Sequence, residues 1–219
     1  MSDDWQQAFE VAERTALEAG RLVMEGFRAS GRVSRKGKFD LVTEFDFASE
    51  ELIRDRIGTA FPSHRIVGEE GEASGEGAFV WYVDPIDGTV NFAHGHPYFC
   101  VSVALFREAE GLVGIVHAPA LGITWKAARG IGAFRNDEPC RVSSRSSLDE
   151  ALCTTGFPGN IAATSDTNEA EIGAFARETR GIRRCGSAAL DLAMVGDGTY
   201  DIYWERALKP WDIGGGMVI

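Results

Sequence analysis

The spacing of apolar residues predicts two amphipathic helices at the start of the chain. The first covers residues 5 to about 29 and ends near Gly31. The second follows Thr43, a suitable N-cap residue, and ends before Pro62. The apolar positions are Phe9, Ala12, Ala16, Val23 and Phe27 in the first helix, and Phe45, Leu52, Ile53 and Ile57 in the second. We therefore expect each helix to bury one face.

Short apolar runs further along predict strands. Residues 66–67 and 79–83 have the composition of buried strands, and Pro85 should end the second because proline cannot donate to a ladder. Three later runs, separated by turns, predict an antiparallel meander at residues 100–106, 112–117 and 124–127. The remaining elements are predicted as a strand at 148–156, a helix at 166–179, a strand at 182–184, a helix at 187–195, a strand at 200–205 and a helix start after Pro210.

Composition indicates an ordinary globular protein. The 219 residues are 44% hydrophobic and 25% charged, and no interdomain linker is evident, so we expect a single domain over residues 1–219. The formal net charge is 22 − 33 = −11, which disfavours general electrostatic binding of nucleic acid. The sequence ends in an apolar Met-Val-Ile within a predicted helix, so we also expect the natural chain to continue.

The cysteines and the N-terminus indicate the compartment. The four cysteines form no Cys-x-x-Cys pair, which disfavours a zinc knuckle or a dithiol redox site. The first residues are acidic where a signal peptide would be basic, and no apolar run approaches the length of a membrane span. We therefore expect a cytoplasmic protein with reduced thiols and no membrane partner.

Two acids lie in a tight turn directly after the central apolar run. Asp84 and Asp87 are three positions apart, Gly88 permits close backbone approach, Thr89 adds a hydroxyl and Ile86 a free carbonyl. Crowded carboxylates repel one another unless a cation neutralises them, and oxygen ligands of this kind favour Mg²⁺ or Mn²⁺. An ordinary turn is the alternative, since Asp, Pro and Gly are common turn residues.

Other acids also fall at the predicted ends of short elements. Asp46, Glu69 and Asp212 have this position, as a metal cluster assembled at element ends would require. A solvated acidic loop is the alternative for Glu69. His94 and His96 lie close in sequence, but no third soft ligand is near them, which disfavours zinc.

Five motifs carry a resemblance to a known family. They are Asp-Leu-Val-Thr at 40–43, Gly-Glu-Glu at 68–70, Asp-Pro-Ile-Asp-Gly-Thr at 84–89, Gly-Ser-Ala-Ala-Leu-Asp at 186–191, and Trp-Glu at 204–205 followed by Pro-Trp-Asp at 210–212. In their order and over the length of the chain, they resemble the inositol monophosphatase family of magnesium-dependent, lithium-sensitive sugar phosphatases. The resemblance implies an α+β fold, layered as an αβαβα sandwich, and a homodimer.

The resemblance also implies how metal ions would be held. Glu69, Asp84 and the carbonyl of Ile86 would bind one magnesium ion. Asp84, Asp87 and Asp212 would bind a second, and a weaker third ion would lie near Glu69. Two such ions would clamp the attacking and leaving oxygens of a phosphoryl displacement, and one would acidify the attacking water.

The same resemblance assigns catalytic roles. Thr89, hydrogen-bonded to Asp46, would orient and deprotonate the water beside Glu69, so these three residues are the expected catalytic set. Glu70 is expected to have only a supporting or surface role. Lys36 and Lys38 lie in a loop that closes over the site in relatives, although a basic surface loop would explain them equally well.

Substrate contacts are expected on both sides of the metal ligands. The phosphate would lie near Asp87 and against the backbone N–H groups of Gly88 and Thr89. The hydroxyls of a small polyol would contact Glu205 and the segment 186–188. The residues of that segment are Gly186, Ser187 and Ala188.

The favoured substrate is myo-inositol monophosphate. The alternatives on the same scaffold are histidinol phosphate, fructose 1,6-bisphosphate and 3′-phosphoadenosine 5′-phosphate, and Glu205 favours a polyhydroxylated compound over a nucleotide. A different class is a non-catalytic regulatory protein that binds a transcription partner through Arg183-Arg184 or the basic segment 32–38. Such a protein would be expected to lack a metal ligand, and all five acids and Thr89 are present.

Overall fold

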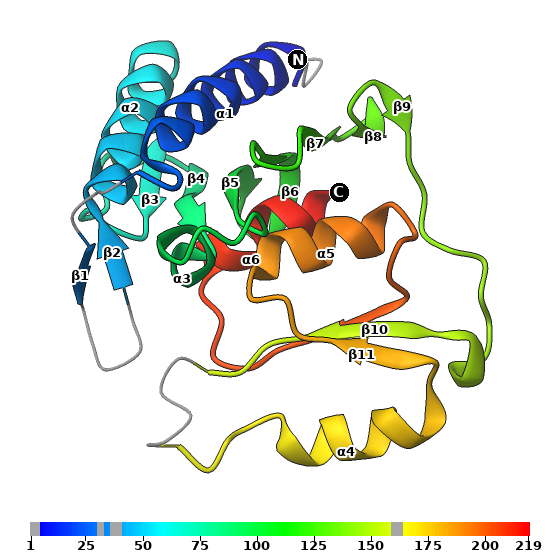
Figure 1. The fold of residues 1–219 in the computed structure, drawn as a ribbon. Coiled ribbons are helices and arrows are strands. Elements are labelled where there is room, and N and C mark those ends of the chain that lie inside the picture. The colour runs from blue at the N-terminus through cyan, green and yellow to red at the C-terminus, as the bar shows by residue number, and fades with distance from the viewer. Residues whose placement is uncertain (1–4, 30–32, 36–40, 159–163) are drawn as a thin grey trace.

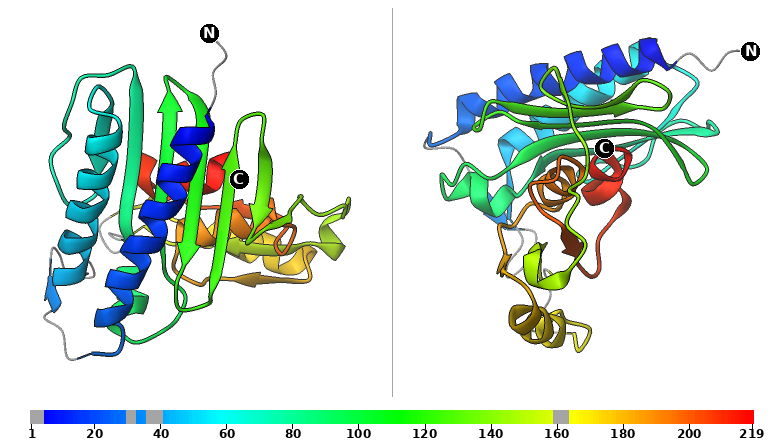
Figure 2. Two further views of the ribbon diagram at one scale, coloured as in Figure 1. Left: turned by 90° about the horizontal axis from the view of Figure 1, so that it is seen from above. Right: turned by 90° about the vertical axis from the view of Figure 1, so that its right-hand side faces the viewer.

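The computed structural model describes residues 5–29, 33–35, 41–158 and 164–219, and their elements form five layers (Figure 1). Helices α1 and α2 cover one face of a seven-stranded sheet, and α5 and α6 cover the other face. A three-stranded sheet lies beyond α5 and α6, with α4 outside it, as the side view in Figure 2 shows. The predicted α+β class and αβαβα layering are confirmed.

The described helices are α1 (Gln6–Gly26), α2 (Glu44–Ala60), α3 (Thr89–Ala93), α4 (Glu169–Glu178), α5 (Ala188–Gly196) and α6 (Pro210–Val218), with a 3₁₀ turn at Leu148–Glu150. The predicted N-cap of α2 is confirmed. The hydroxyl of Thr43 accepts a hydrogen bond from the Phe45 N–H, while Asp46 accepts one from the Thr43 N–H. This capping box fixes the start of the helix.

The large sheet has the spatial order β3 (Arg65–Gly68), β4 (Phe79–Asp87), β5 (Cys100–Arg107), β6 (Glu110–Ala118), β7 (Ile123–Ala128), β8 (Gly132–Arg135) and β9 (Glu138–Pro139). Strands β3 and β4 are parallel, and every later neighbouring pair is antiparallel, so the predicted meander is confirmed. The small sheet is parallel, with the order β11 (Gly181–Arg183), β10 (Leu152–Thr155) and β12 (Ile202–Trp204). Strand β1 (Val33–Arg35) pairs antiparallel with β2 (Leu41–Thr43).

The predicted end of the central strand is wrong. Strand β4 continues to Asp87, because its pairing with β5 skips from Asp84 to Asp87. Pro85 lies inside this irregularity, where its missing N–H breaks no ladder bond, and its carbonyl accepts a hydrogen bond of 3.2 Å from the Ser49 hydroxyl. The irregularity turns the strand end without ending the strand.

Two other local predictions were also incomplete. Residues 148–150 form a 3₁₀ turn, so only the later part of the strand predicted at 148–156 is present as β10. Strands β8 and β9 were not predicted, because they are short and largely exposed and carry no buried apolar run. Hairpin pairing with β7 holds β8 in the sheet.

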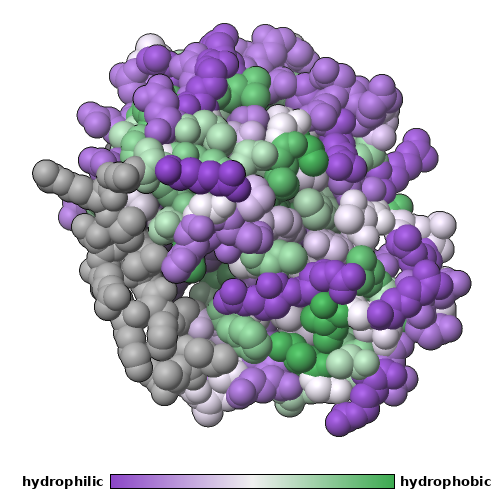
Figure 3. All heavy atoms as spheres, in the orientation of Figure 1, coloured by the Kyte–Doolittle hydropathy of each residue, from purple (hydrophilic) through white to green (hydrophobic). Residues whose placement is uncertain are grey.

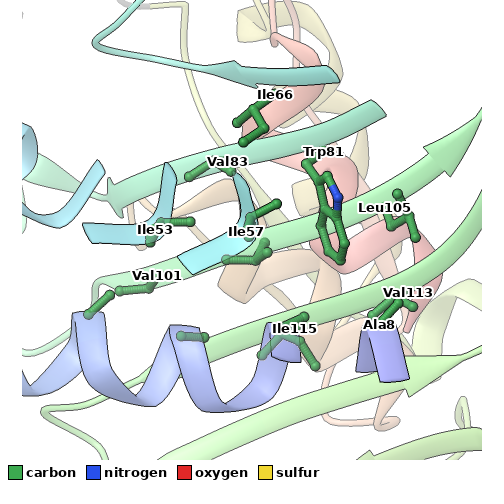
Figure 4. Close-up of a cluster of buried hydrophobic side chains, with 14 of the residues drawn as sticks. Ala8, Ile53, Ile57, Ile66, Trp81, Val83, Val101, Leu105, Val113 and Ile115 are labelled. Carbon is green, nitrogen blue, oxygen red and sulfur yellow. The ribbon is translucent and has the colours of Figure 1, made fainter. Parts of the chain in front are cut away.

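The main hydrophobic core lies between the large sheet and the first two helices (Figure 4). Trp81, Leu105 and Ile115 of the sheet are fully buried against this layer, as are Ile53 and Ile57 of α2. Each such side chain contributes about 1.5–3 kcal/mol through burial of apolar surface. The apolar stripes predicted from the sequence therefore form this interface.

A run of glycines brings α6 close to the opposite face of the sheet. A Cβ atom on Gly215 would lie 2.6 Å from the Ser102 hydroxyl oxygen, and one on Gly114 of β6 would lie 2.5 Å from the Gly215 carbonyl oxygen. Glycine inside a helix costs about 1 kcal/mol relative to alanine. The close approach explains the glycines, and it seats the first turn of α6, which carries Asp212, against the sheet.

Hydrophilic and apolar side chains are unevenly distributed on the surface of the protein. In Figure 3 hydrophilic side chains predominate along the upper edge, where α1 and α2 lie in Figure 1, and apolar side chains are more frequent across the middle of this face. Among the described helices, none combines the length and the apolar character needed to cross a membrane.

Candidate active site

The residues predicted for the site meet at one cavity of about 260 Å³. It lies where the ends of several elements converge. The predicted residues in its lining are Glu69, Asp84, Ile86, Asp87, Gly88, Thr89, Gly186, Ser187, Ala188, Glu205 and Asp212. Asp46 is not part of the lining, but the Thr89 hydroxyl lies 3.2 Å from its Oδ1 atom. The structure therefore brings together every predicted site residue.

The parallel pairing of β3 and β4 places two of the acids side by side. Gly68 pairs with Val83, so Glu69 and Asp84 are the next positions on neighbouring strands. Asp84 is only 2% exposed, and its Oδ1 atom accepts a hydrogen bond of 3.1 Å from the Ile86 N–H. The ends of two parallel strands thus deliver both acids to the same edge of the cavity.

Gly88 connects β4 to α3 in a left-handed conformation, with φ of 95°. A Cβ atom at this position would lie 3.1 Å from the carbonyl oxygens of both Tyr98 and Gly186. Glycine is therefore required for the conformation as well as for the space. This turn places Thr89 at the first position of α3, on the cavity wall.

The hydroxyl of Thr89 lies between two acceptors. It is 3.2 Å from Asp46 Oδ1 and 3.0 Å from the carbonyl oxygen of Ile86. Asp46 is fully buried, and its Oδ2 atom accepts hydrogen bonds from the Thr43 N–H at 2.8 Å and the Thr43 hydroxyl at 2.5 Å. The capping box of α2 therefore fixes the carboxylate that Thr89 contacts.

Asp87 links the large sheet to the start of α5. Its Oδ2 atom accepts hydrogen bonds from the Ser187 hydroxyl at 2.6 Å and from the Ala189 N–H at 2.7 Å. At the start of α6, Asp212 Oδ2 accepts a hydrogen bond of 2.6 Å from the Lys209 N–H. In the part of the chain that the structure describes, no hydrogen bond occupies the other oxygen of either carboxylate, so it is left for a ligand.

Burial and mutual repulsion raise the pKa values of these acids. Burial, with the charge of Glu69 as the next cause, raises the pKa of Asp84 well above its usual range. Burial raises the pKa of Asp87 to about 8, although the hydrogen bond from Ser187 opposes the shift. The pKa of Asp212 is also raised, again mainly by burial. Buried carboxylates that lie close to one another fit a site that takes up cations.

The acids line the cavity openly rather than as a preformed cage. Within the described residues, no three His, Cys, Asp or Glu side chains already stand in a closed metal-binding arrangement. The donor set itself, which consists of carboxylates, a backbone carbonyl and hydroxyls, suits the hard cations Mg²⁺ and Mn²⁺. This donor chemistry therefore fits the predicted metal.

Glu205 approaches the cavity from the end of β12. The Tyr203 hydroxyl donates a hydrogen bond of 2.9 Å to its Oε2 atom, and burial raises the pKa of Glu205 to about 7. A Cβ atom on Gly156 would collide with the Glu205 carboxylate, so glycine makes room for it. Glu205, which is predicted to bind the substrate, is thus held in the cavity wall by its neighbours.

A buried acid on α2 supports the loop that carries Glu69. Glu50 is 2% exposed, and its two carboxylate oxygens accept hydrogen bonds of 2.8 Å from the N–H groups of Glu70 and Gly71. Arg54 donates to the same carboxylate at 2.7 Å. Glu50 was not predicted from the sequence, because its partners are about 20 positions away.

Glu70 is not among the lining residues, which agrees with the lesser role expected for it.

Other residues of the lining were also missed. They are Phe157, Pro158, Arg184, Arg206, Ala207 and Leu208. Arg184 was considered only for an alternative partner surface, and the structure places it on the cavity wall. Its position two residues before Gly186 was a usable signal, as was that of Arg206 directly after Glu205. Lys36 and Lys38 lie outside the described residues.

The remaining candidates are less informative. His94 and His96 do not line the cavity. All four cysteines are free, as predicted.

A layered α+β fold with an acid-lined cavity at its element ends defines a class of metal-dependent phosphatases. The model of the inositol monophosphatase family matches residues 4–219, and the chain belongs to that family. The resemblance noted from the five motifs is therefore confirmed.

Individual relatives agree with this assignment. The chain is 39% identical over 219 residues to an inositol-1-monophosphatase of Synechocystis, covering 99% of this chain and 76% of the relative. It is 40% identical over 207 residues to a fructose-1,6-bisphosphatase/inositol-1-monophosphatase of Thermotoga maritima, covering 92% and 77%. The solved inositol monophosphatase of Anabaena (Nostoc) superposes with a TM-score of 0.90 at 37% identity, covering 98% and 81%. The protein is thus a phosphoric monoester hydrolase of a metal-dependent family.

Proposed function

We propose that the protein hydrolyses a phosphate monoester of a small polyol with Mg²⁺, and that myo-inositol monophosphate is the favoured substrate. The observation that carries the proposal is the cavity itself. It combines clustered acids with the Thr89–Asp46 pair and with Glu205, a recessed acceptor for hydroxyl groups. Mn²⁺ is a possible substitute, because it accepts the same oxygen ligands.

The acids of the lining would supply the ligands of two ions. Glu69, Asp84 and the Ile86 carbonyl would hold one, with a weaker third ion near Glu69. Asp84, Asp87 and Asp212 would hold the other. When bound, magnesium supplies positive charge that neutralises the phosphoryl oxygens and acidifies a water molecule.

The protein's own groups would move the proton. The Thr89 hydroxyl can donate to Asp46 while its oxygen accepts a proton from a water in the cavity, since one hydroxyl both donates and accepts. Asp46 is held by Thr43 on its other oxygen, so this direction of donation is favoured. Glu69, on the adjacent strand end, would orient the same water.

The remaining contacts would position the substrate. Backbone N–H groups of Gly88 and Thr89 would donate to the phosphate beside Asp87. Glu205 would accept hydrogen bonds from hydroxyls far from the phosphorus, and segment 186–188 would line the polyol. This arrangement favours a polyhydroxylated substrate over a nucleotide.

The second candidate is fructose 1,6-bisphosphate, which is supported by the name of the Thermotoga maritima relative. Histidinol phosphate and 3′-phosphoadenosine 5′-phosphate are weaker alternatives, since Glu205 suits several hydroxyls. Homodimer formation, a cytoplasmic location and a regulatory partner stay predictions.

The test is phosphate release from inositol, histidinol, fructose and nucleotide phosphates with and without Mg²⁺. We expect Mg²⁺-dependent release that is fastest for inositol monophosphate. Absence of Mg²⁺-dependent release from every compound would refute the proposal.

A Glu205→Gln variant tests the substrate class. It should lower kcat/KM for inositol monophosphate by about ten- to a hundredfold, as expected for one charge-assisted hydrogen bond. An aryl phosphate without ring hydroxyls is the matched control and should be nearly unaffected. A parallel fall for both compounds would show that Glu205 belongs to the metal or folding framework.

A further inference from the structure

The cavity wall contains an arginine without an ion-pair partner among the residues that the structure describes. Of the two arginines in the lining, Arg206 is engaged by ion pairs with Asp166, at 2.6 Å, and with Glu171. Arg184 forms neither an ion pair nor a side-chain hydrogen bond with any residue that the structure describes. It is also exposed. Its guanidinium is therefore available to a ligand.

Arg184 is nevertheless held in place. Its guanidinium carbon lies 5.7 Å from the centroid of the Phe157 ring, in a cation–π contact, and Phe157 lines the same cavity. A Cβ atom on Gly186 would lie 3.3 Å from Arg184 Nη1, so the side chain runs close over this glycine, which has φ of 87°. An aromatic ring and a glycine turn thus keep the guanidinium at the wall.

The electrostatic couplings place Arg184 near Glu205. Its charge opposes the burial that raises the pKa values of Glu205 and Asp191. The cation therefore lies near the proposed polyol contact.

We propose that Arg184 binds a second anionic group of the substrate, beside the polyol contact at Glu205. A guanidinium presents a planar fork of donors that matches an oxyanion in two parallel hydrogen bonds. The substrate class is then a sugar or polyol phosphate that carries a second phosphate or a carboxylate. This inference rests on the proposed function, because it assigns a further substrate contact in the same cavity.

The comparison of a bisphosphate with the matching monophosphate tests the role of Arg184. We would measure kcat/KM for fructose 1,6-bisphosphate and fructose 1-phosphate at fixed free Mg²⁺, in the wild type and in Arg184→Met. The variant should lower the bisphosphate value by about ten- to a hundredfold and the monophosphate value much less. Arg184→Lys keeps the charge but not the planar fork of donors, so its kcat/KM for the bisphosphate should lie between the values of the wild type and Arg184→Met.

The neighbouring arginine provides a control. Arg183 is exposed and does not line the cavity, so Arg183→Met should leave the ratio of the two values unchanged. A second substrate pair identifies the anion: 6-phosphogluconate carries a far carboxylate, and glucitol 6-phosphate is its neutral counterpart. If Arg184→Met lowers kcat/KM for 6-phosphogluconate more than for glucitol 6-phosphate, a carboxylate is sufficient for the contact. If both values are unchanged, the contact is restricted to a phosphate.

Two results would overturn the inference. An unchanged ratio in Arg184→Met would show that the guanidinium does not contact the second anion, and a parallel fall of both values would show that it acts on a step common to both substrates. If the wild type cleaves inositol monophosphate but not the fructose phosphates, the inhibition constant of fructose 1,6-bisphosphate against it gives the same readout. Failure of the proposed function is a separate result, since it requires no Mg²⁺-dependent release from any monoester.

Discussion

Replacement of Glu50 by Gln tests how the protein holds the loop that carries Glu69. The carboxylate accepts hydrogen bonds from two backbone N–H groups and from Arg54. A glutamine has a single acceptor oxygen, and its NH₂ group would face a donor. The substitution therefore removes at least one charge-assisted hydrogen bond and creates a donor–donor contact in a buried place.

The magnitude follows from these contacts. One hydrogen bond to a charged group contributes about 1.5–3 kcal/mol, so we expect the free energy of unfolding to fall by about 2–4 kcal/mol. For a chain of this size, each kcal/mol lowers Tm by about 2–4 °C. A loosened Glu69 should also weaken Mg²⁺ binding by about ten- to a hundredfold, as is typical when a residue supporting a metal ligand is removed.

Two measurements separate these effects. Thermal unfolding without metal gives the change in stability, and a Mg²⁺ titration by calorimetry, well below Tm, gives the change in affinity. Glu51→Gln is the matched control, because Glu51 is the exposed neighbour on the same helix. A lower Tm with unchanged Mg²⁺ affinity would refute the positioning role, and no change in either quantity would refute the argument from buried hydrogen bonds.

Four further predictions concern the site and its supporting structure. Asp84→Asn should remove most phosphate release while the circular dichroism spectrum is retained, and wild-type turnover at saturating Mg²⁺ would contradict a bridging role. Thr89→Ala should lower kcat by about 10²–10⁴ and KM far less, and equal changes in both would limit Thr89 to phosphate positioning. Gly215→Ala should destabilise the protein by about 1–3 kcal/mol in denaturant titrations, because its Cβ would lie 2.6 Å from the Ser102 hydroxyl oxygen, and an unchanged midpoint would show that α6 can shift freely. The pKa of Asp87 is raised to about 8, so above the ordinary carboxyl pKa the folded metal-free protein binds more protons than the unfolded chain. Tm measured in EDTA should therefore fall as the pH rises toward about 8, and Mg²⁺ should make this fall smaller. A Tm in EDTA that does not change with pH would contradict the raised pKa.

The sequence was informative where the chemistry is local. Asp84, Asp87 and Thr89 lie within six residues, and their turn is set by Gly88, so a short motif was enough to locate them. The amphipathic pattern of the first two helices likewise predicted which faces are buried, because a helix repeats its contacts every three to four residues.

The missed features depend on contacts across the fold. Glu50 could not be recognised, because its partners belong to a loop that only tertiary packing brings near α2. The place of Arg184 on the cavity wall could not be predicted, since two adjacent arginines have the same local pattern whether they face a cavity or solvent. The continuation of β4 past Pro85 depends on its pairing with β5. The rule that proline ends a strand takes no account of the neighbouring strand, so it could not predict this continuation.

The cavity draws its walls from three layers, since Asp87 belongs to the large sheet, Ser187 precedes α5, and Glu205 follows the small sheet. Turnover therefore requires all three layers to be docked at once, which makes enzymatic activity a probe of sub-global unfolding. If the small sheet separates while the large sheet stays folded, the protein becomes inactive without losing most of its secondary structure. In a denaturant titration, loss of activity would then precede loss of the far-ultraviolet circular dichroism signal.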